Sequence, residues 1–587
     1  MSPTPSFAAA VRAAEVPRYV SDKLVDAHGG SKARACDALR ADPYGQLHAV
    51  GGGIEHADAL AAALSLPFET RLLGHARWTM ATAPVLAYRP LLMKLRLSME
   101  HSDQGIRAGL DRIFASHALM RIGDCVVHPD YHAKNTRIAS AVDDRGRPAA
   151  HAQMDAAFAA IQSGLTGEQR RALTAIAAHR IVVLTGGPGS GKSRIVREMC
   201  EAFPNTRVMA PTGRAARNAS GRTVHYFKII QEAGASDVAG AELVIVDEAS
   251  MLSTDLMCAV LDLAPAGAHI VLVGDVDQLP PIDPGDVLRD IIQSGRCPVV
   301  TLTHNHRNAS VIEAFAREVL QGSASETEGP AVEYLPCESF GDVLDAMAGL
   351  AWESSIVLSP HNVTRIALNR AMQLLVHGHA GHEVEIKLEK SFADAPRGTR
   401  GVASVVYGRH PKVHVTADGD VRFTATLLAA LDLVAVDGAR IEGSVQAEAG
   451  TVILEGDRVI VTRNTEDACN GDIGMYGAAG VMFPEEPGEH MGSDRQILKT
   501  IPPATPTDPG ITLAYAVTVH KAQGSEFDTV VLPVTNVGAW DRTLLYTAIT
   551  RAKYKVYILG ALADVQAIAT SARPPRPSIL RHIFSAM

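Results

Sequence analysis

The sequence has few cysteines, and none of them lies in a metal-binding or redox pattern. The seven cysteines are scattered along the chain, and no two of them form a CxxC pair. The odd count and the irregular spacing argue against a disulfide framework, a zinc site or an iron–sulfur cluster. We therefore expect a protein of a reducing compartment, the cytoplasm.

Long apolar segments are also missing. The 587 residues contain no uninterrupted apolar run that approaches the ~20 residues of a membrane span. The N-terminus has no basic start followed by a long apolar stretch, so we expect no secretory signal. The composition, 47% hydrophobic and 20% charged, is that of a soluble globular protein. The length predicts about two to four domains.

Excess positive charge is absent as well, since the formal net charge is −9. An acidic exterior does not by itself indicate nucleic-acid binding, but it is compatible with a local groove that binds a nucleic-acid strand. One stretch, from Arg71 to Arg121, is locally basic. We interpret it as a solvated helical face in preference to a surface that faces nucleic acid, and both interpretations remain open.

Short apolar runs of strand length are what the sequence does contain, from about residue 166 onward. A first set lies at 181–187, 207–212, 242–248 and 269–275, and a second at 354–360, 528–534 and 555–561. Runs that are apolar on both faces and separated by helix-length segments predict buried parallel strands. Two sets predict two α/β domains with a cleft between them, and such sheets bind ligands at the carboxyl ends of their strands.

The strand sets divide the chain into three parts. We expect an N-terminal domain of unknown role at 1–150 and a first α/β domain at 151–295, with a small insertion at about 216–241. A second α/β domain follows at 296–587. Its stretches 376–450 and 471–510 have alternating Val-rich segments and turn signals such as Asn470-Gly471 and Asp418-Gly419-Asp420, which predict inserted β structure.

A phosphate-binding loop follows the run at 181–187. The spacing Gly-x4-Gly-Lys-Ser directly after a strand is the context in which this motif is credible. Backbone N–H groups of such a loop surround phosphate oxygens at the positive end of a helix. Lys192 would reach the β- and γ-phosphates, and the Ser193 hydroxyl would bind Mg²⁺. The predicted nucleotide-binding residues of the loop are Gly187, Pro188, Gly189, Ser190, Gly191, Lys192 and Ser193.

Acidic and amide side chains follow two further strand runs. The run Leu243–Val246 ends in Asp247 and Glu248. Asp247 would hold Mg²⁺, and Glu248 would orient and deprotonate the attacking water. Gln278, in the loop after 269–275, is placed to contact the γ-phosphate. Together with the phosphate loop, these residues predict ATP hydrolysis with Mg²⁺.

In this order the motifs resemble those of the superfamily-one helicases, and within them the RecD-like branch that moves 5′ to 3′. The resemblance covers about 165–320, 354–372 and 453–560. It implies two RecA-like domains with an SH3-like insertion, and it implies that Gln169 contacts adenine and Glu526 the nucleotide. Segments 302–307 and 546–553 resemble two further motifs, which implies that Arg307 and Arg551 contact phosphates, Arg551 as an arginine finger. The single-strand contacts that the resemblance implies are Pro211, Thr212, Gly213, Arg214, Thr223, His225, Ser359, Pro360, Thr518, His520 and Lys521.

The resemblance predicts an ATP-dependent DNA helicase that translocates 5′ to 3′ on single-stranded DNA and hydrolyses ATP in the cleft between two RecA-like domains. Its expected partners are single-stranded DNA of a tailed duplex and proteins of recombination, replication or conjugation, with roles in DNA repair and recombination. Two alternatives stay open. One is an RNA helicase of the same superfamily, because such motifs separate DNA from RNA poorly. The other is a DNA-stimulated ATPase switch or loader, because the short 216–241 insertion leaves a strand-separating pin in doubt.

Overall fold

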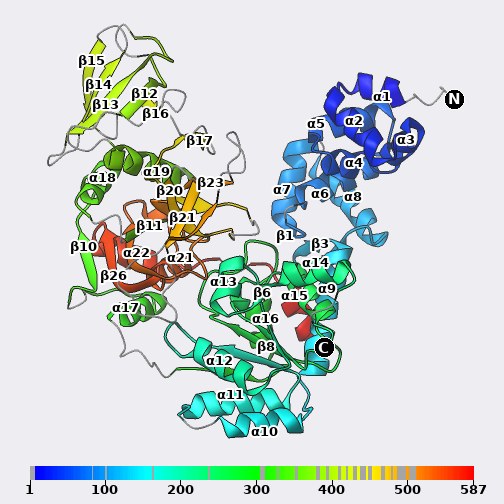
Figure 1. Cartoon of the computed structure of the whole chain (residues 1–587). Coiled ribbons are helices and arrows are strands. Elements are labelled where there is room, and N and C mark those ends of the chain that lie inside the picture. Colours follow the sequence, from blue (N-terminus) through cyan, green and yellow to red (C-terminus); the bar gives the residue numbers. More distant parts are fainter. Residues whose placement is uncertain are drawn as a thin grey trace.

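Two parallel β-sheets form the body of the protein, seen here in a computed structural model (Figure 1). The structure describes residues 7–81, 83–99, 102–161, 164–235, 238–303, 311–326, 329–350, 355–377, 384–391, 395–406, 412–417, 421–426, 433–436, 445–446, 452–463, 468, 470–477, 480–484, 497–501, 510–574 and 576–587.

The first sheet carries the phosphate loop. Its strand order is β6-β5-β7-β8-β4-β9, and all neighbours are parallel. The strands are β4 (Ile181–Thr185), β5 (Thr206–Ala210), β6 (Arg222–Thr223), β7 (Leu243–Val246), β8 (His269–Gly274) and β9 (Val299–Thr301). The predicted runs thus became β4, β5, β7 and β8. β9 pairs with β4 although it lies past residue 295, so the first sheet extends to Thr301.

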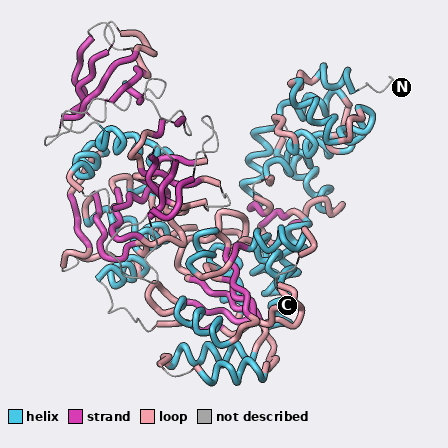
Figure 2. The backbone as a smooth tube through the Cα atoms, viewed as in Figure 1, coloured by secondary structure: helices cyan, strands magenta, loops and turns pink. Residues whose placement is uncertain are grey.

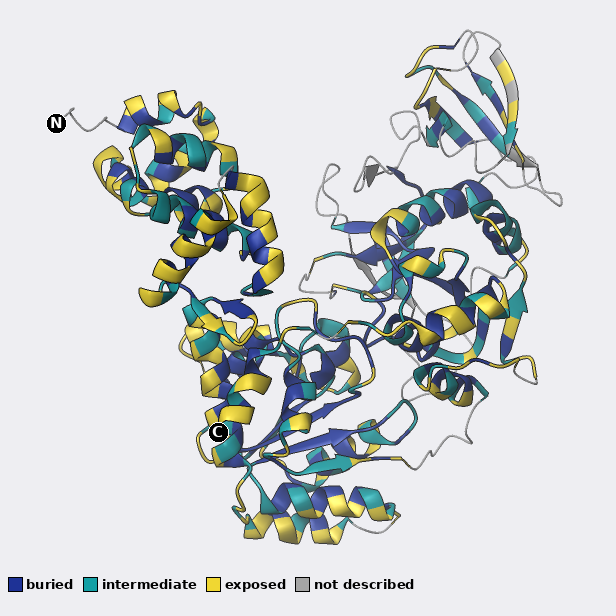
Figure 3. Ribbon diagram, turned by 180° about the vertical axis from the view of Figure 1, so that it is seen from behind, coloured by how far each residue is buried: buried dark blue, intermediate teal, exposed yellow. Residues whose placement is uncertain are grey.

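Helices cover both faces of the first sheet, which is why its strands are apolar on both sides (Figure 3). Alternate residues such as Val183 and Val182 therefore belong to two different apolar cores. One core is closed by α10 (Ala152–Ala160), α11 (Gly167–Ala178) and α12 (Lys192–Ala202). The other is closed by α9 (Pro129–Arg145), α14 (Val224–Glu232), α15 (Thr254–Leu263), α16 (Val287–Ser294) and α23 (Ile579–Ala586).

The second sheet has the order β10-β26-β25-β11-β24, again with parallel neighbours. Its strands are β10 (Val332–Leu335), β11 (Ser355–Ser359), β24 (Ala516–Thr518), β25 (Phe527–Pro533) and β26 (Ala552–Leu559). Its helices are α17 (Val311–Leu320), α18 (Phe340–Ala348), α19 (Asn362–His377), α21 (Arg542–Ile549) and α22 (Leu562–Thr570). The predicted fold class, two RecA-like parallel-sheet domains, is confirmed.

Two antiparallel sheets lie between α19 and β24 in sequence, which confirms the predicted inserted β structure. The first has the strands β12 (Val384–Leu388), β13 (Arg400–Val406), β14 (Lys412–Ala417), β15 (Val421–Thr426) and β16 (Val434–Val436). A pair, β17 (Val445–Gln446) and β18 (Val452–Ile453), follows. The second sheet has β19 (Arg458–Val461), β20 (Ile473–Gly477), β21 (Gly480–Pro484), β22 (Ile497–Ile501) and β23 (Ile511–Leu513).

The turn signals within these sheets had different outcomes. Gly471 has a φ of +101°, a left-handed conformation that suits glycine, and its N–H donates to the Val461 carbonyl at 2.9 Å. The Asn470-Gly471 turn thus lies directly before β20. The predicted turn at 418–420 lies outside the described residues.

The N-terminal part is an extra domain of short helices with one small three-stranded sheet, β1-β3-β2 (Figure 2). Its elements are α1 (Phe7–Ala13), α2 (Arg18–Ala27), α3 (Lys32–Ala41), α4 (Pro43–Ala49), α5 (Ile54–Ala63), α6 (Phe68–Thr79), β1 (Val85–Ala87), α7 (Tyr88–Met99), α8 (Asp103–Ala115), β2 (Met120–Ile122) and β3 (Cys125–Val127).

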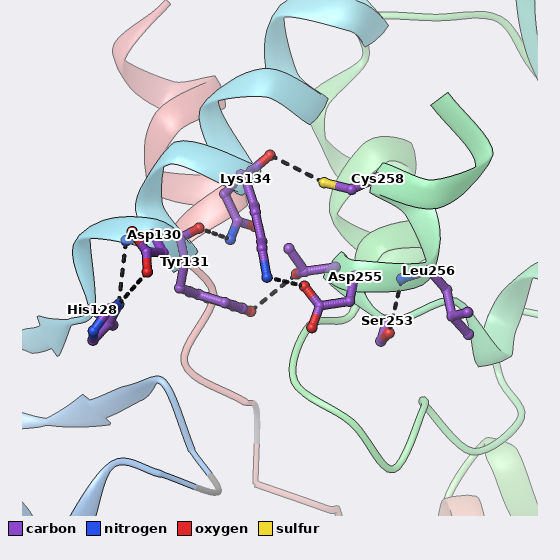
Figure 4. Close-up of polar contacts among 10 residues, drawn as sticks. His128, Asp130, Tyr131, Lys134, Ser253, Asp255, Leu256 and Cys258 are labelled. Atoms are coloured by element: carbon purple, nitrogen blue, oxygen red, sulfur yellow. Dashed lines mark hydrogen bonds and ion pairs between the residues drawn. The ribbon is translucent and has the colours of Figure 1, made fainter. Parts of the chain in front are cut away.

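Helix α9 joins this domain to the first sheet by packing along α15 (Figure 4). The Lys134 ammonium pairs with the Asp255 carboxylate at 2.6 Å, and the Thr254 hydroxyl donates to the Tyr131 phenol oxygen at 3.1 Å. The Cys258 thiol donates to the Lys134 carbonyl at 3.8 Å. These contacts tie the N-terminal helices to the domain that carries the phosphate loop.

Helix α23 follows the second sheet in sequence but packs on the first domain. Leu580 and Phe584 are buried in the same core as Ile138 of α9. Arg581 pairs with the buried Asp290 carboxylate at 3.2 Å, and the Ser578 hydroxyl donates to it at 2.5 Å. The chain therefore passes from the first domain to the second and back again.

Across the described ranges, none of the helices is both long and apolar enough to cross a membrane.

Candidate nucleotide and nucleic-acid site

The phosphate loop runs from the end of β4 into α12. Gly189 and Gly191 have φ angles of +71° and +89°, so both occupy the left-handed region that side-chain-bearing residues avoid. The Ser190 hydroxyl donates to the Gly187 carbonyl at 2.8 Å and stiffens the loop. The Lys192 ammonium lies over the same loop and donates to the carbonyls of Gly186 at 2.5 Å and Gly187 at 2.9 Å. The predicted loop residues thus surround one point at the start of α12.

Asp247 and Glu248 lie at the carboxyl end of β7, two strands from the loop in the order β7-β8-β4. Burial raises the pKa of Asp247 to about 7, the Glu248 carboxylate adds to the rise, and Lys192 opposes it. Glu248 has a φ of +51°, a strained conformation that tends to persist at functional sites. The two carboxylates concentrate negative charge that a bound cation would neutralise, so this pair and the Ser193 hydroxyl suit Mg²⁺.

The loop after β8 is organised around the buried side chain of Asp275. Its carboxylate accepts hydrogen bonds from the Asp277 N–H at 3.0 Å and from Gln278 Nε2 at 3.3 Å. Gln278 Oε1 is buried, and it has no hydrogen-bond partner among the described residues. A buried amide oxygen without a partner is costly, which suits a side chain whose hydrogen-bond donor, such as the attacking water, arrives with the ligand.

This loop also contacts the second domain. The Tyr546 hydroxyl on α21 donates to the Asp275 carboxylate at 2.8 Å, and burial together with Asp275 raises the pKa of this phenol. The Leu279 N–H donates to the Thr547 hydroxyl at 3.0 Å, and its carbonyl accepts from Gln523 Nε2 at 3.1 Å. A Cβ atom on Gly187 would lie 3.6 Å from the Tyr546 hydroxyl. The phosphate loop, the Gln278 loop and α21 therefore meet at one place between the two domains.

Arg551, which follows the C-cap of α21, is only 5% exposed. Its guanidinium donates to the Thr547 carbonyl at 3.1 Å, the Ser525 carbonyl at 3.3 Å and the Thr550 hydroxyl at 3.2 Å. These contacts all belong to the second domain, so Arg551 is held beside the cleft by its own domain. Arg307 lies outside the described residues.

Gln169 and Glu526 lie on either side of the loop in sequence. Gln169 is buried at the start of α11, where its side-chain oxygen accepts from the Thr166 N–H at 3.0 Å in a capping box. The adjacent Glu168 carboxylate accepts from the Thr303 N–H at 2.7 Å and from the Thr303 hydroxyl. Glu526 is exposed, next to the Ser525 carbonyl that Arg551 contacts.

The predicted strand-contacting residues of the first domain lie at or just after the carboxyl ends of β5 and β6, at the sheet edge away from β9. Thr212 caps α13 (Gly213–Asn218), where its hydroxyl accepts from the Ala215 N–H at 3.3 Å. Thr223 caps α14 in the same way, with the Tyr226 N–H at 3.1 Å, and His225 is exposed beside it. Pro211 and Gly213 are half-buried at the same edge.

The corresponding residues of the second domain lie at or just after the carboxyl ends of β11 and β24, which are neighbours at one edge of that sheet. Ser359 is paired with Thr518 in the register of these strands. Ser359 and Pro360 are buried, and the Ser359 hydroxyl donates to the His361 carbonyl at 3.0 Å, so a strand contact there would use the backbone. Lys521 is exposed and His520 half-buried. Burial lowers the pKa of His520, and the nearby Arg573 and Arg576 contribute to the shift.

Helix α13 of the first domain contacts the second domain, and the sequence motifs alone did not indicate these contacts. Asn218 Nδ2 donates to the Gly524 carbonyl at 2.8 Å, and Arg217 pairs with Asp472. The Arg214 guanidinium lies over the Phe527 ring, 5.6 Å from its centroid. These partners are some 250 to 310 residues apart in sequence, so no local pattern indicates them.

The arrangement defines a P-loop nucleotide-binding protein with two RecA-like domains, and comparisons with known proteins show what the chain is similar to. The family described as AAA domain matches 164–334, and the one described as UvrD-like helicase C-terminal domain matches 513–559. The ATP-dependent RecD2 DNA helicase of Deinococcus radiodurans is 30% identical over 453 residues, which are 71% of this chain and 52% of that protein. The RecBCD enzyme subunit RecD of Mycobacterium tuberculosis is 27% identical over 470 residues, 70% of this chain and 72% of that protein. The chain thus spans about half the length of the first of these relatives.

The resemblance to the RecD-like proteins of helicase superfamily one is thereby confirmed, and the chain is related to them over about 70% of its length. Among solved structures, the Pif1 helicase from Bacteroides in complex with ADP-AlF3 and ssDNA superposes with a TM-score of 0.36 at 16% identity. That superposition covers 70% of this chain and 95% of the other.

Proposed function

We propose that this protein is an ATP-dependent DNA helicase that translocates 5′ to 3′ on single-stranded DNA. The observation that carries the proposal is the junction at Asp275. There the loop that follows β8 of the nucleotide domain is hydrogen-bonded to Tyr546 and Thr547 of the second domain. A change at the γ-phosphate would reach the second domain through this junction without any intermediate element.

The residues of the chain divide the chemistry among them. Lys192 and the loop N–H groups bind the phosphates, Glu248 accepts a proton from the attacking water, and Gln278 contacts the γ-phosphate. Ser193 and Asp247 would hold Mg²⁺, which neutralises phosphate charge. Arg551, and Arg307 with it, would bind the charge that develops in the transition state, since a planar guanidinium suits phosphate oxygens. We propose Gln169 and Glu526 as contacts to the nucleotide beyond the phosphates.

Movement along single-stranded DNA follows from the position of the residues that we propose to contact it. Thr212, Thr223 and His225 lie on the first domain, whereas Thr518, His520 and Lys521 lie on the second. A single strand of DNA that crosses both sheet edges is bound by both domains. Closing of the cleft then shifts the contacts of one domain along the strand relative to those of the other. Pro211, Gly213, Arg214, Ser359 and Pro360 would complete the track.

The test uses duplexes with a single-stranded tail at the 5′ or the 3′ end, with ATP and Mg²⁺. We expect unwinding from the 5′ tail only, and ATPase activity stimulated by single-stranded DNA more than by RNA of the same sequence. Unwinding from the 3′ tail alone contradicts the polarity, and equal stimulation by RNA contradicts the DNA preference. Strong stimulation without strand separation indicates a switch or loader instead. Protein partners in recombination, replication or conjugation belong to this proposal, since one relative carries the name of a RecBCD subunit.

A further inference from the structure

The sheet formed by β12, β13, β14 and β15 has one apolar and one basic face. Its inward side chains, such as Ile386 and Val415, are buried in the core of the second domain. The outward positions alternate with these along each strand, as the two-residue period of a strand requires. Exposed outward residues are Lys387, Arg400, Lys412, His414, Arg422 and Thr424, and half-buried ones are Glu385, Val402, Ser404 and Thr416.

The strand register brings the positive charges together. Lys387 lies directly opposite Arg400 on the neighbouring strand, and Arg422 lies opposite Thr416. Like charges at directly opposed positions destabilise a sheet. Among the described outward positions Glu385 is the one carboxylate against four lysines and arginines, although the whole chain carries a net charge of −9. A local excess of positive charge on an acidic protein is the pattern of an anion-binding surface.

The chemistry of this face suits a phosphodiester backbone. The described outward positions offer cations and hydroxyls, which contact phosphate oxygens, but no Phe, Tyr or Trp, and their one ring, the His414 imidazole, is hydrogen-bonded to the Thr424 hydroxyl at 2.7 Å. Surfaces that grip unpaired strands combine a basic groove with rings on which bases stack. A face that has the charges without a row of Phe, Tyr or Trp rings fits the outside of a double helix.

The sheet is also fixed to the second α/β domain. Arg370 on α19 pairs with Glu389, which follows β12, at 3.0 Å and donates to the Val434 carbonyl of β16 at 3.1 Å. These two contacts join the helix to the sheet. The sheet stands beyond α18 and α19, at the end of the molecule remote from the phosphate loop (Figure 1). We propose that the outward face of β12–β15 binds the backbone of duplex DNA, a role that rests on the proposed function and extends it to the unopened part of the substrate.

The test compares the full chain with a variant in which three of these cations are neutral, Lys387→Gln, Lys412→Gln and Arg422→Gln. Fluorescence anisotropy of a labelled blunt duplex, without nucleotide, gives the Kd over a series of salt concentrations. Each lost phosphate contact lowers the slope of log K against log salt by ~0.9, so we expect a decrease of about 2 to 3 and a Kd at least about tenfold higher at low salt. Single-stranded DNA should bind to the neutral variant almost as tightly as it binds to the unmodified chain.

Two matched variants serve as controls. Arg12→Gln, Lys23→Gln and Lys32→Gln remove three exposed cations from the N-terminal helices, so the net charge changes equally while duplex binding should not. Lys387→Arg, Lys412→Arg and Arg422→Lys keep the charge and should restore binding, which separates a charge effect from damage to the sheet.

Equal duplex affinity and salt slope for the neutral variant and the N-terminal control would overturn the proposal. An equal loss for single-stranded DNA would overturn the assignment to duplex. Both readouts are independent of catalysis. If the unmodified chain shows no DNA-stimulated ATPase activity, the proposed function fails, whereas the anisotropy result still decides whether this face binds DNA.

Discussion

Replacing Tyr546 with phenylalanine removes a single oxygen atom from the junction between the two domains. That hydroxyl donates to the Asp275 carboxylate, which is only 2% exposed. A hydrogen bond to a charged group contributes about 1.5–3 kcal/mol, equivalent to roughly a 10- to 100-fold change in rate if it is lost only in the transition state. Asp275 keeps two other donors, from Asp277 and Gln278. We therefore expect the lower end of this range.

The assay is ATP hydrolysis with and without single-stranded DNA, alongside a measurement of nucleotide affinity. Tyr546→Phe should lower the DNA-stimulated kcat about tenfold, while basal hydrolysis and the nucleotide Kd change little. We expect this loss of stimulation because the hydroxyl couples the Gln278 loop of the first domain to α21 of the second. Basal hydrolysis should persist because Lys192 is unchanged.

Tyr515→Phe is a matched control. Its hydroxyl donates to another buried carboxylate, Asp457, at the same 2.8 Å, but both groups lie within the second domain. This variant should lower the melting temperature and leave the ratio of stimulated to basal hydrolysis unchanged. The reasoning is refuted if Tyr546→Phe keeps full stimulation, or if Tyr515→Phe loses it to the same extent.

Further expectations concern the nucleotide site and the stability of each domain. Lys192→Ala should abolish hydrolysis with an unchanged melting curve, and retained turnover would contradict the site assignment. Arg551→Ala should lose turnover by roughly 10³-fold or more and keep nucleotide affinity, because an arginine finger acts in the transition state; weakened nucleotide binding would instead indicate a ground-state role. Asp457→Ala should destabilise the second domain by about 3–5 kcal/mol in denaturant unfolding, since it removes a buried acceptor of four hydrogen bonds. Burial raises the pKa of Asp290 to about 6, above its unfolded value, so the stability of the first domain should fall as pH rises from about 4 to 6. Asp290→Asn should flatten that dependence in thermal melts, and an unchanged pH profile would refute the assignment.

The parallel strands could be predicted because burial on both faces leaves a local signature. The runs at 181–187 and 242–248 are apolar from Ile181 to Leu184 and from Leu243 to Val246, and the structure packs helices on both sides of them. The short β9 and β10 were not predicted, since segments of three and four residues carry too little pattern. The phosphate loop was also visible locally, because its glycines and lysine are contiguous.

Contacts between the domains left no such signature. Tyr546 and Asp275 lie 271 residues apart, and only the fold brings them together. The sequence could indicate that both segments belong to motifs, but it could not indicate that one donates to the other. The basic face of β12–β15 was hidden for a related reason: its cations are spread over four strands, and only the register assembles them into one surface.

The docking of α23 on the first domain has a consequence for the order in which the protein can fold during synthesis. Leu580 and Phe584 close the same core as Ile138 and Val142, so that core is incomplete when the last strand of the first sheet, which ends at Thr301, has been made. At ribosomal rates of ~5–20 residues per second, roughly 15 to 60 s pass before Phe584 follows. During that interval the apolar sides of α9 and α16 that later receive α23 stay open to water. A nascent first domain would therefore need a temporary cover, such as a chaperone, until α23 arrives.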